Sequence, residues 1–227
     1  MRCIYCHQSF RETLTWSSFL FQEKERPLCE ECQNSFELVG EYGCDICSRL
    51  LKDSAKVGRC PDCIAWESHD KWSGTLSQNR SIFLYNESMK NYLAQYKYRG
   101  DYELSCFFRP LMKKKIASFS YDELVPIPVS SQRLYERGFN QVEGMLEDLK
   151  YSSLLTRKTS EKQSKKTKQE RMSIENPFLV ERGLSIAGKK IVLVDDIYTT
   201  GSTLRQAAKV LKNSGARHVC SVTLVRG

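Results

Sequence analysis

Hydrophobic residues after position 80 follow two alternating patterns. Short, continuous apolar runs predict buried strands, and apolar residues that recur every three or four positions predict amphipathic helices between them. The expected strands are 81–85, 124–129, 154–157, 191–194 and 218–225, and the expected helices are 87–99, 104–117, 141–149 and 203–214. Because buried strands that alternate with helices form parallel sheets covered on both faces, this part of the chain is predicted to be α/β with a mostly parallel sheet flanked by helices.

The first 68 residues follow neither pattern and instead repeat a cysteine pair with the spacing C-x-x-C. The four pairs are Cys3/Cys6, Cys29/Cys32, Cys44/Cys47 and Cys60/Cys63. Two thiolates at this spacing can bind one Zn²⁺, and two such turns complete a tetrahedral site. Eight ligands therefore predict two structural zinc sites, which would supply the folding energy that so short a segment cannot obtain from an apolar core. Redox dithiols are the alternative reading, but they rarely come four at a time.

Spacing alone leaves the pairing of the four cysteine turns open. Pairing in sequence order joins the first turn to the second and the third to the fourth, and we favour this arrangement. A cross-braced arrangement would join the first turn to the third and the second to the fourth. Both arrangements use the same eight sulfur ligands, so the prediction of two zinc ions does not depend on the choice.

Composition narrows the class of protein. Of the 227 residues, 41% are hydrophobic and 27% are charged, as is typical of one large or two modest folded domains. No apolar run approaches the ~20 residues that span a bilayer, and no apolar segment occupies the N-terminus. We therefore expect a cytoplasmic protein that does not insert into membranes.

The net charge of +8 is unevenly distributed. Residues 1–68 contain 8 basic and 11 acidic residues, whereas residues 69–227 contain 27 basic and 16 acidic residues. We therefore expect a boundary between an acidic zinc-binding head, 1–68, and a basic α/β body, 69–227. A phosphate-bearing partner such as nucleic acid is expected to bind the body, because a positive field attracts anions.

The segment 191–203 contains the strongest candidate for a ligand site. Its apolar run leads into two adjacent carboxylates, Asp195 and Asp196, and a short hydroxyl-rich loop comes next, before the following helix. The loop residues are Thr199, Thr200, Gly201, Ser202 and Thr203. Backbone N–H groups, hydroxyls and a helix N-terminus together can hold a phosphate. Because two carboxylates would repel a bare phosphate, a ribose phosphate complexed with Mg²⁺ fits both parts of the segment. A capped helix start accounts for one hydroxyl but not for the whole run.

A basic stretch at 157–171 has seven Lys or Arg residues, two Glu residues and no apolar stripe. We expect it to belong to a flexible loop at about 157–178. Such a run is often only a solvated surface, but it can also contact several nucleic-acid phosphates. The candidate DNA-binding residues are Lys162, Lys165, Lys166, Lys168 and Arg171.

Several ordered motifs resemble known families. Val192–Thr203 resembles the phosphoribosyl pyrophosphate (PRPP) motif of type I phosphoribosyltransferases. Further matching segments are Tyr96–Asp101, Val125–Pro128 with Arg133, Glu136–Gln141, and Gln163 through Phe178. Together with the cysteine pairs, they resemble the ComF family of late competence proteins over essentially the whole chain. The resemblance implies a small N-terminal double zinc ribbon followed by a type I phosphoribosyltransferase-like domain.

The resemblance also implies roles for individual residues. Asp195 and Asp196 would contact the ribose hydroxyls, and the loop Thr199–Thr203 would hold the 5′-phosphate. The turn from Val129 to Arg133 would bind pyrophosphate, with Mg²⁺ bound to the same ligand. The candidate residues in that turn are Ser130, Ser131 and Arg133. Helix capping is an equal alternative for Arg137 and Asn140, and a helix-dipole role is favoured for Lys97.

Three functions are consistent with these features. The resemblance implies a competence accessory protein for DNA uptake in natural transformation, which would bind a PRPP-type ligand and single-stranded DNA and work with a ComFA-type DNA-dependent ATPase, a helicase. The alternative is a catalytic phosphoribosyltransferase, in which Asp195 or Asp196 would stabilise a cationic ribose while pyrophosphate leaves. A weaker hypothesis is a PRPP-sensing regulator. No segment of the sequence identifies a pocket for an acceptor base or amine.

Overall fold

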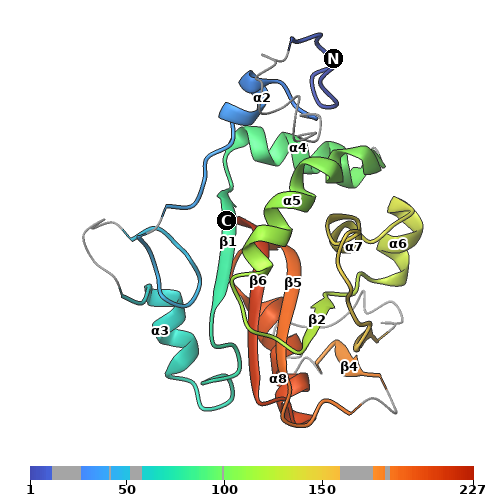
Figure 1. The fold of residues 1–227 in the computed structure, drawn as a ribbon. Coiled ribbons are helices and arrows are strands. Elements are labelled where there is room, and N and C mark those ends of the chain that lie inside the picture. Colours follow the sequence, from blue (N-terminus) through green and yellow to red (C-terminus); the bar gives the residue numbers. More distant parts are fainter. Residues whose placement is uncertain (12–26, 41, 52–57, 99, 159–175, 182–184) are drawn as a thin grey trace, which may run out of the picture.

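The computed structural model describes residues 1–11, 27–40, 42–51, 58–98, 100–158, 176–181 and 185–227. A four-stranded sheet in the order β1-β6-β5-β2 forms its centre (Figure 1). The strands are β1 (Asn79–Leu84), β2 (Glu123–Pro126), β5 (Lys190–Tyr198) and β6 (His218–Arg226). Neighbouring strands are parallel throughout, as their continuous apolar runs predict. A separate antiparallel pair joins β3 (Leu155–Arg157) to β4 (Phe178–Val180).

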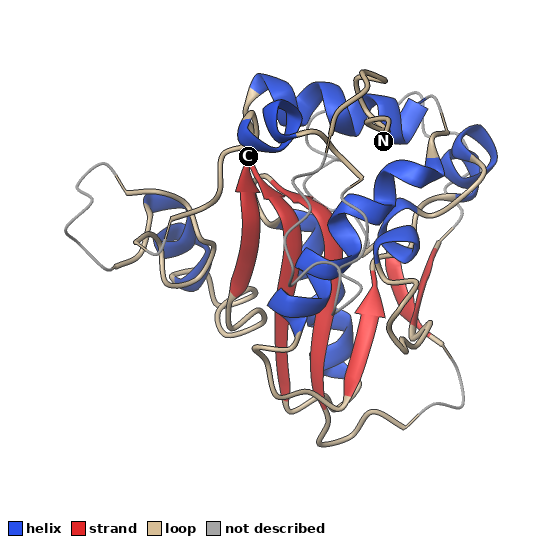
Figure 2. Ribbon diagram, turned by 45° about the horizontal axis from the view of Figure 1, so that its top comes forward, coloured by secondary structure: helices blue, strands red, loops and turns tan. Residues whose placement is uncertain are grey.

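Helices lie on both faces of the sheet (Figures 1 and 2). Helices α5 (Ser105–Ile116) and α7 (Gln141–Met145) lie on one face, and α8 (Ser202–Asn213) lies on the other. Helix α4 (Glu87–Tyr98) follows β1 at the carboxyl ends of the strands. The remaining helices are α2 (Glu30–Asn34), α3 (Pro61–Glu67), α6 (Ser131–Arg137) and the 3-10 turn η1 (Tyr102–Leu104). Among the described residues, no helix is both long enough and apolar enough to cross a membrane.

Alternate residues of the central strands pack into two separate cores. In β5, Val192 and Val194 belong to the core that contains the apolar residues of α4 and α5. Ile191 and Leu193 belong to the core that contains the apolar residues of α8. Successive side chains of a strand point to opposite faces of the sheet. A strand without polar residues therefore requires other elements to pack on both faces.

Several element boundaries differ from the expected ones; strand β2, for example, ends at Pro126 rather than at residue 129. Strand β5 continues four residues beyond the apolar run, because Ile197 and Tyr198 still pair with β6. The two carboxylates therefore lie within the strand rather than after it. Helix α7 ends at Met145 instead of residue 149, and residues 131–137, expected in part as a turn, form α6. In each case tertiary pairing or a local cap, which periodicity does not report, determines where the element ends.

The cysteine-rich head packs along the edge of β1. The Val39 N–H donates to the Ile82 carbonyl at 2.8 Å, and the Leu84 N–H donates to the Glu37 carbonyl at 2.8 Å. These bonds place a short antiparallel segment beside β1 and cover backbone groups that would otherwise be open at the sheet edge. The boundary at residue 68 between head and body stays a prediction.

Candidate ligand pocket and metal centres

A cavity of about 250 Å³ lies at the carboxyl ends of β2 and β5. Its walls come from the segment after β2 and from α6, α7, β3, β5 and α8, and they combine two acids with three arginines. The lining residues are Ile127, Pro128, Val129, Arg133, Arg137, Gln141, Val142, Arg157, Asp195, Asp196, Ile197 and Thr203. Ligands of open α/β sheets bind at this edge, and mixed charges suit a ligand with both hydroxyl and anionic groups.

The two acids of β5 have different partners. Asp195 accepts a hydrogen bond at Oδ1 from the backbone N–H of Asp196 at 2.9 Å. Asp196 forms an ion pair with Lys97 of α4, and the two side chains are only 19% and 12% exposed. Lys97 lies in the last turn of its helix as expected, but it also pairs with a carboxylate that lines the cavity, so its role is not only to interact with the helix dipole. The sequence could not reveal this pair, because 98 residues separate its members.

Asp195 lies in an environment that disfavours its charged form. Burial and, to a smaller extent, the adjacent negative charge of Asp196 together raise the pKa of Asp195 to about 8, against the opposing effects of the Asp196 backbone N–H and of Lys97. The carboxyl is therefore largely protonated at neutral pH in the unliganded protein. Perturbed acids of this kind are typical of ligand and active sites, where a bound charge or hydrogen-bond donor completes the environment.

Three arginines supply the positive side of the cavity. Arg137 donates from Nη1 to Gln141 Oε1 at 2.7 Å, and within the described part of the chain its buried Nε has no hydrogen-bond partner. Burial lowers the pKa of Arg157, and the nearby charge of Arg133 lowers it further, while Asp195 acts in the opposite direction. Arg157 was not identified as a site residue from sequence; its position at the end of a short apolar strand was the only signal.

Only part of the loop after β5 lines the cavity. Thr203, in the first turn of α8, lines it, whereas Thr199 and Thr200 are exposed beyond it. Gly201 is the N-cap of α8 with φ of 80°, and a Cβ at this position would overlap the Tyr198 hydroxyl. Only glycine combines this left-handed conformation with such a close approach. The first N–H groups of α8 have no partners within the helix, as at any helix start.

The turn expected to bind pyrophosphate is the start of helix α6. Ser130 is its N-cap, and the Ser130 hydroxyl accepts a hydrogen bond from the Arg133 N–H at 3.3 Å. Ser131 is the first residue of the helix, and of these three side chains Arg133 lines the cavity. Asn140 caps α7 by accepting from the Val142 N–H at 3.0 Å, which is the capping role considered for it.

The proposed DNA-binding residues lie outside the described residues. They are Lys162, Lys165, Lys166, Lys168 and Arg171. The described ends of this segment are held together, because β3 pairs with β4 and the Lys158 N–H donates to the Pro177 carbonyl at 2.8 Å. The described residues on either side of this segment therefore lie together, next to Arg157, which lines the cavity.

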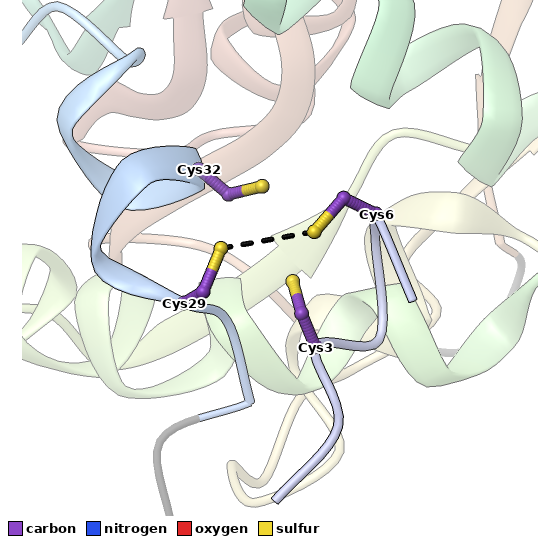
Figure 3. Close-up of side chains that lie close together, drawn as sticks. All are labelled: Cys3, Cys6, Cys29 and Cys32. Atoms are coloured by element: carbon purple, nitrogen blue, oxygen red, sulfur yellow. Dashed lines mark hydrogen bonds between the residues drawn. The ribbon is translucent and has the colours of Figure 1, made fainter. Parts of the chain in front are cut away.

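The first two cysteine turns form one sulfur cluster. Cys3, Cys6, Cys29 and Cys32 place their Sγ atoms within 4.8 Å of one another. Figure 3 shows the four side chains pointing toward a common centre, with the Sγ atoms of Cys6 and Cys29 3.7 Å apart. The cluster packs against Phe36 and the apolar residues of α4.

The last two cysteine turns form the second cluster. Cys44, Cys47, Cys60 and Cys63 also place their Sγ atoms within 4.8 Å of one another, with those of Cys47 and Cys60 3.6 Å apart. This cluster belongs to the core that contains Tyr198 and α8. The turns are therefore paired in sequence order, as favoured, and the cross-braced arrangement is excluded.

Both clusters fit zinc. Four thiolates around a tetrahedral Zn²⁺ at about 2.3 Å lie about 3.8 Å from one another, close to the two sulfur distances in the structure. Closed sites of four cysteines are structural, so a bound Zn²⁺ would crosslink two turns of the chain. The second cluster also has the outer contact that such sites require, because a guanidinium N–H of Arg226 donates to Cys47 Sγ at 3.5 Å.

Comparisons with known proteins agree with this architecture. Residues 110–227 match the phosphoribosyl transferase domain family. The chain is 36% identical over 229 residues to competence protein ComFC of Streptococcus pneumoniae, covering 100% of both chains. It is 36% identical over 230 residues to competence protein ComFC of Bacillus subtilis, covering 99% of this chain and 94% of that protein. DNA utilization protein YhgH of Salmonella typhimurium is 25% identical over 216 residues, covering 85% and 93%.

These matches confirm the predicted fold class. The body is a phosphoribosyltransferase-type α/β domain with a parallel sheet, and the two four-cysteine clusters before it are compatible with a zinc ribbon. The resemblance noted in the sequence is confirmed as well, because both full-length matches carry the same family name.

Proposed function

The chain belongs to the ComFC family and carries a phosphoribosyl transferase domain, and on this premise we propose that it is an accessory protein for DNA uptake in natural transformation. It acts in the cytoplasm, binds a PRPP-type ligand with Mg²⁺ and single-stranded DNA, and works with a ComFA-type DNA-dependent ATPase. Two relatives named competence proteins and a third named a DNA utilization protein support the role in DNA uptake.

The observation that carries the ligand proposal is the presence of two acids and three arginines in one cavity. Asp195 and Asp196 offer carboxylate oxygens to ribose hydroxyls, and the Nε of Arg137, which has no partner among the described residues, is available to an anion. With Arg133 and Arg157 beside it, this group suits a pyrophosphate, because guanidinium binds phosphate oxygens in pairs. The loop Thr199–Thr203 then faces the 5′-phosphate. Mg²⁺ bound to the ligand would neutralise part of the pyrophosphate charge.

Catalytic phosphoribosyl transfer is the second candidate, supported by the domain match and by the perturbed Asp195. One feature of the cavity favours the accessory role over it. Among the described lining residues none is aromatic, so nothing in the lining would stack against an acceptor base. The two functions share the ligand and differ only in whether a chemical step occurs after binding.

Calorimetry with Mg²⁺-PRPP tests the ligand proposal. Zinc-replete, full-length protein is expected to bind Mg²⁺-PRPP saturably, and to bind ribose 5-phosphate or pyrophosphate more weakly, because each engages only part of the cavity. Absence of binding to Mg²⁺-PRPP would contradict the proposal. Incubation with a panel of bases and amines then separates the two functions: pyrophosphate release that depends on one acceptor and on Asp195 would establish the transferase instead.

Neutralising the basic loop tests the DNA proposal. Replacement of Lys162, Lys165, Lys166 and Lys168 by glutamine is expected to weaken single-stranded DNA binding. It should also flatten the plot of log affinity against log salt by about 0.7 for each phosphate that the variant no longer neutralises. The matched control replaces the exposed or half-exposed Lys113–Lys115 at the end of α5 and should change both quantities less. DNA binding with unaltered salt dependence in the loop variant would remove this loop from the interface.

A further inference from the structure

Arg226, the last residue of β6, connects the second cysteine cluster to the loop that begins at Thr199. Its Nη2 donates to Cys47 Sγ at 3.5 Å, and its Nη1 donates to the carbonyls of Tyr198 and Thr199, each at 3.0 Å. The side chain is only 4% exposed. One buried guanidinium thus contacts a predicted zinc ligand on one side and the start of the candidate phosphate loop on the other.

Trp66 of α3 makes a second connection between the same two parts. Helix α3 begins next to Cys60 and contains Cys63, so the cluster holds its first turn. From the last turn, Trp66 Nε1 donates to the Thr200 carbonyl at 2.9 Å. The neighbouring Glu67 forms an ion pair of 2.9 Å with Arg205 of α8, whose guanidinium lies 5.2 Å from the Trp66 ring centre.

These contacts determine which way the loop presents its N–H groups. In a planar trans peptide the carbonyl and the N–H of the same unit point in opposite directions. Because the carbonyls of Thr199 and Thr200 are held by Arg226 and Trp66, the N–H groups of Thr200 and Gly201 are turned away from the cluster. N–H groups that face outward together are what a phosphate requires of such a loop.

The charge of the cluster contributes to the same arrangement. Four thiolates around one Zn²⁺ have a net charge of −2, which compensates a buried guanidinium beside them. Within the described residues, the buried Nε atoms of Arg226 and Arg205 have no hydrogen-bond partner. Arg205 is paired with Glu67, whereas Arg226 contacts the cluster, so loss of the metal would leave the buried charge of Arg226 uncompensated next to the loop. The first cluster has no comparable contact, since no hydrogen bond or ion pair joins the described residues of 1–40 to residues 198–205.

We infer that the second zinc cluster positions the phosphate loop, with Arg226 and Trp66 as positioning residues. Affinity for a phosphorylated ligand then depends on metal in the second site and not on metal in the first, so zinc loss or thiol oxidation at Cys44, Cys47, Cys60 and Cys63 would lower ligand binding. The ligand part of this inference rests on the proposed function, whereas the coupling of cluster to loop does not.

The test uses two substitutions that leave the cysteines unchanged. Trp66→Phe removes the indole N–H but keeps a ring beside Arg205, and Arg226→Gln removes the charge. Hydrogen exchange of the Thr200 and Gly201 amides in the unliganded protein is expected to be faster in both variants. Affinity for Mg²⁺-PRPP should fall about two- to tenfold for Trp66→Phe, which loses one neutral hydrogen bond, and about tenfold or more for Arg226→Gln. Zinc content should stay at two ions in Trp66→Phe.

Two controls make the test specific. Trp72→Phe alters the neighbouring indole, 5.4 Å from the Trp66 ring, and should leave loop exchange and affinity unchanged. Cys29→Ser should release one zinc ion from the first cluster while ligand affinity survives. Wild-type exchange and affinity in both Trp66→Phe and Arg226→Gln would overturn the inference, as would equal losses in Cys29→Ser. If the wild-type protein itself binds no PRPP, the proposed function fails, and the exchange rates still decide whether the cluster holds the loop.

Discussion

Replacement of Asp195 by asparagine is expected to stabilise the unliganded protein while it weakens binding of Mg²⁺-PRPP. Burial and Asp196 raise the pKa of Asp195 from 3.8 to about 8. Between these values the folded protein binds one proton more than the unfolded chain, so the free energy of unfolding falls as pH rises from about 4 to about 8. Asparagine does not titrate. The stability gain should therefore be absent below pH about 4, grow through this window and level off above it.

Two measurements check this result. The melting temperature of Asp195→Asn, compared with that of the wild type across this pH window, should rise by at least several degrees at pH 8, since about 1 kcal/mol shifts it by about 2–4 °C in a chain of this size. Calorimetry should show affinity for Mg²⁺-PRPP reduced about 10- to 100-fold, the usual effect of losing a hydrogen bond to a charged group. A gain in stability that accompanies a loss of binding is typical of residues kept for function.

Asp196→Asn is the matched control for this prediction. The substitution leaves Lys97 of α4 without its carboxylate, in a position where the side chain is only 12% exposed. We expect weaker ligand binding and lower stability, because a largely buried charge loses its partner. Equal stability of wild type and Asp195→Asn at pH 8 would contradict the pKa argument. Undiminished ligand affinity in both variants would remove the two acids from the site.

Removal of both zinc ions is expected to have the largest effect on stability. The first cluster shares a core with α4 and α5, and the second shares a core with β5 and α8. Chelation would leave seven unbound thiols in these cores and an eighth, that of Cys6, outside them, and it would open four turns that the metal had crosslinked. The melting temperature should fall by more than ~10 °C, since each structural zinc contributes several kcal/mol or more.

The course of unfolding after chelation also tests the boundary at residue 68. Because head and body share cores, we expect one unfolding transition, in which the amides of β5 and β6 lose hydrogen-exchange protection together with those of the head. This protection should return when zinc is restored. Cys106→Ser, which alters a cysteine outside both clusters, should retain two zinc ions and nearly the wild-type melting temperature. Persistent protection of β5 and β6 in the metal-free protein would show instead that 69–227 folds independently of the head.

The local sequence pattern was sufficient to predict those features that depend on residues close together along the chain. The apolar runs of β5 and β6 showed that both faces of the sheet must be buried, although they did not show which helices would bury them. The C-x-x-C spacing places two thiolates on one turn, so the ligands were evident before their pairing was. The acids and the hydroxyl-rich loop directly follow the apolar run of β5 in the sequence. Position 201 is glycine, the one residue type that the backbone conformation there allows.

Tertiary structure decided which distant groups meet these local features. Lys97 reaches Asp196, Arg157 reaches the cavity from β3, and Trp66 reaches the Thr200 carbonyl across 134 residues of sequence. None of these residues differs in its local pattern from an ordinary surface cation or a packed ring. Periodicity reports which face of an element is buried but not which other element covers it. The cavity's charge balance and the contact between the second cluster and the loop that begins at Thr199 therefore depend on strand order and packing, which act between segments rather than within them.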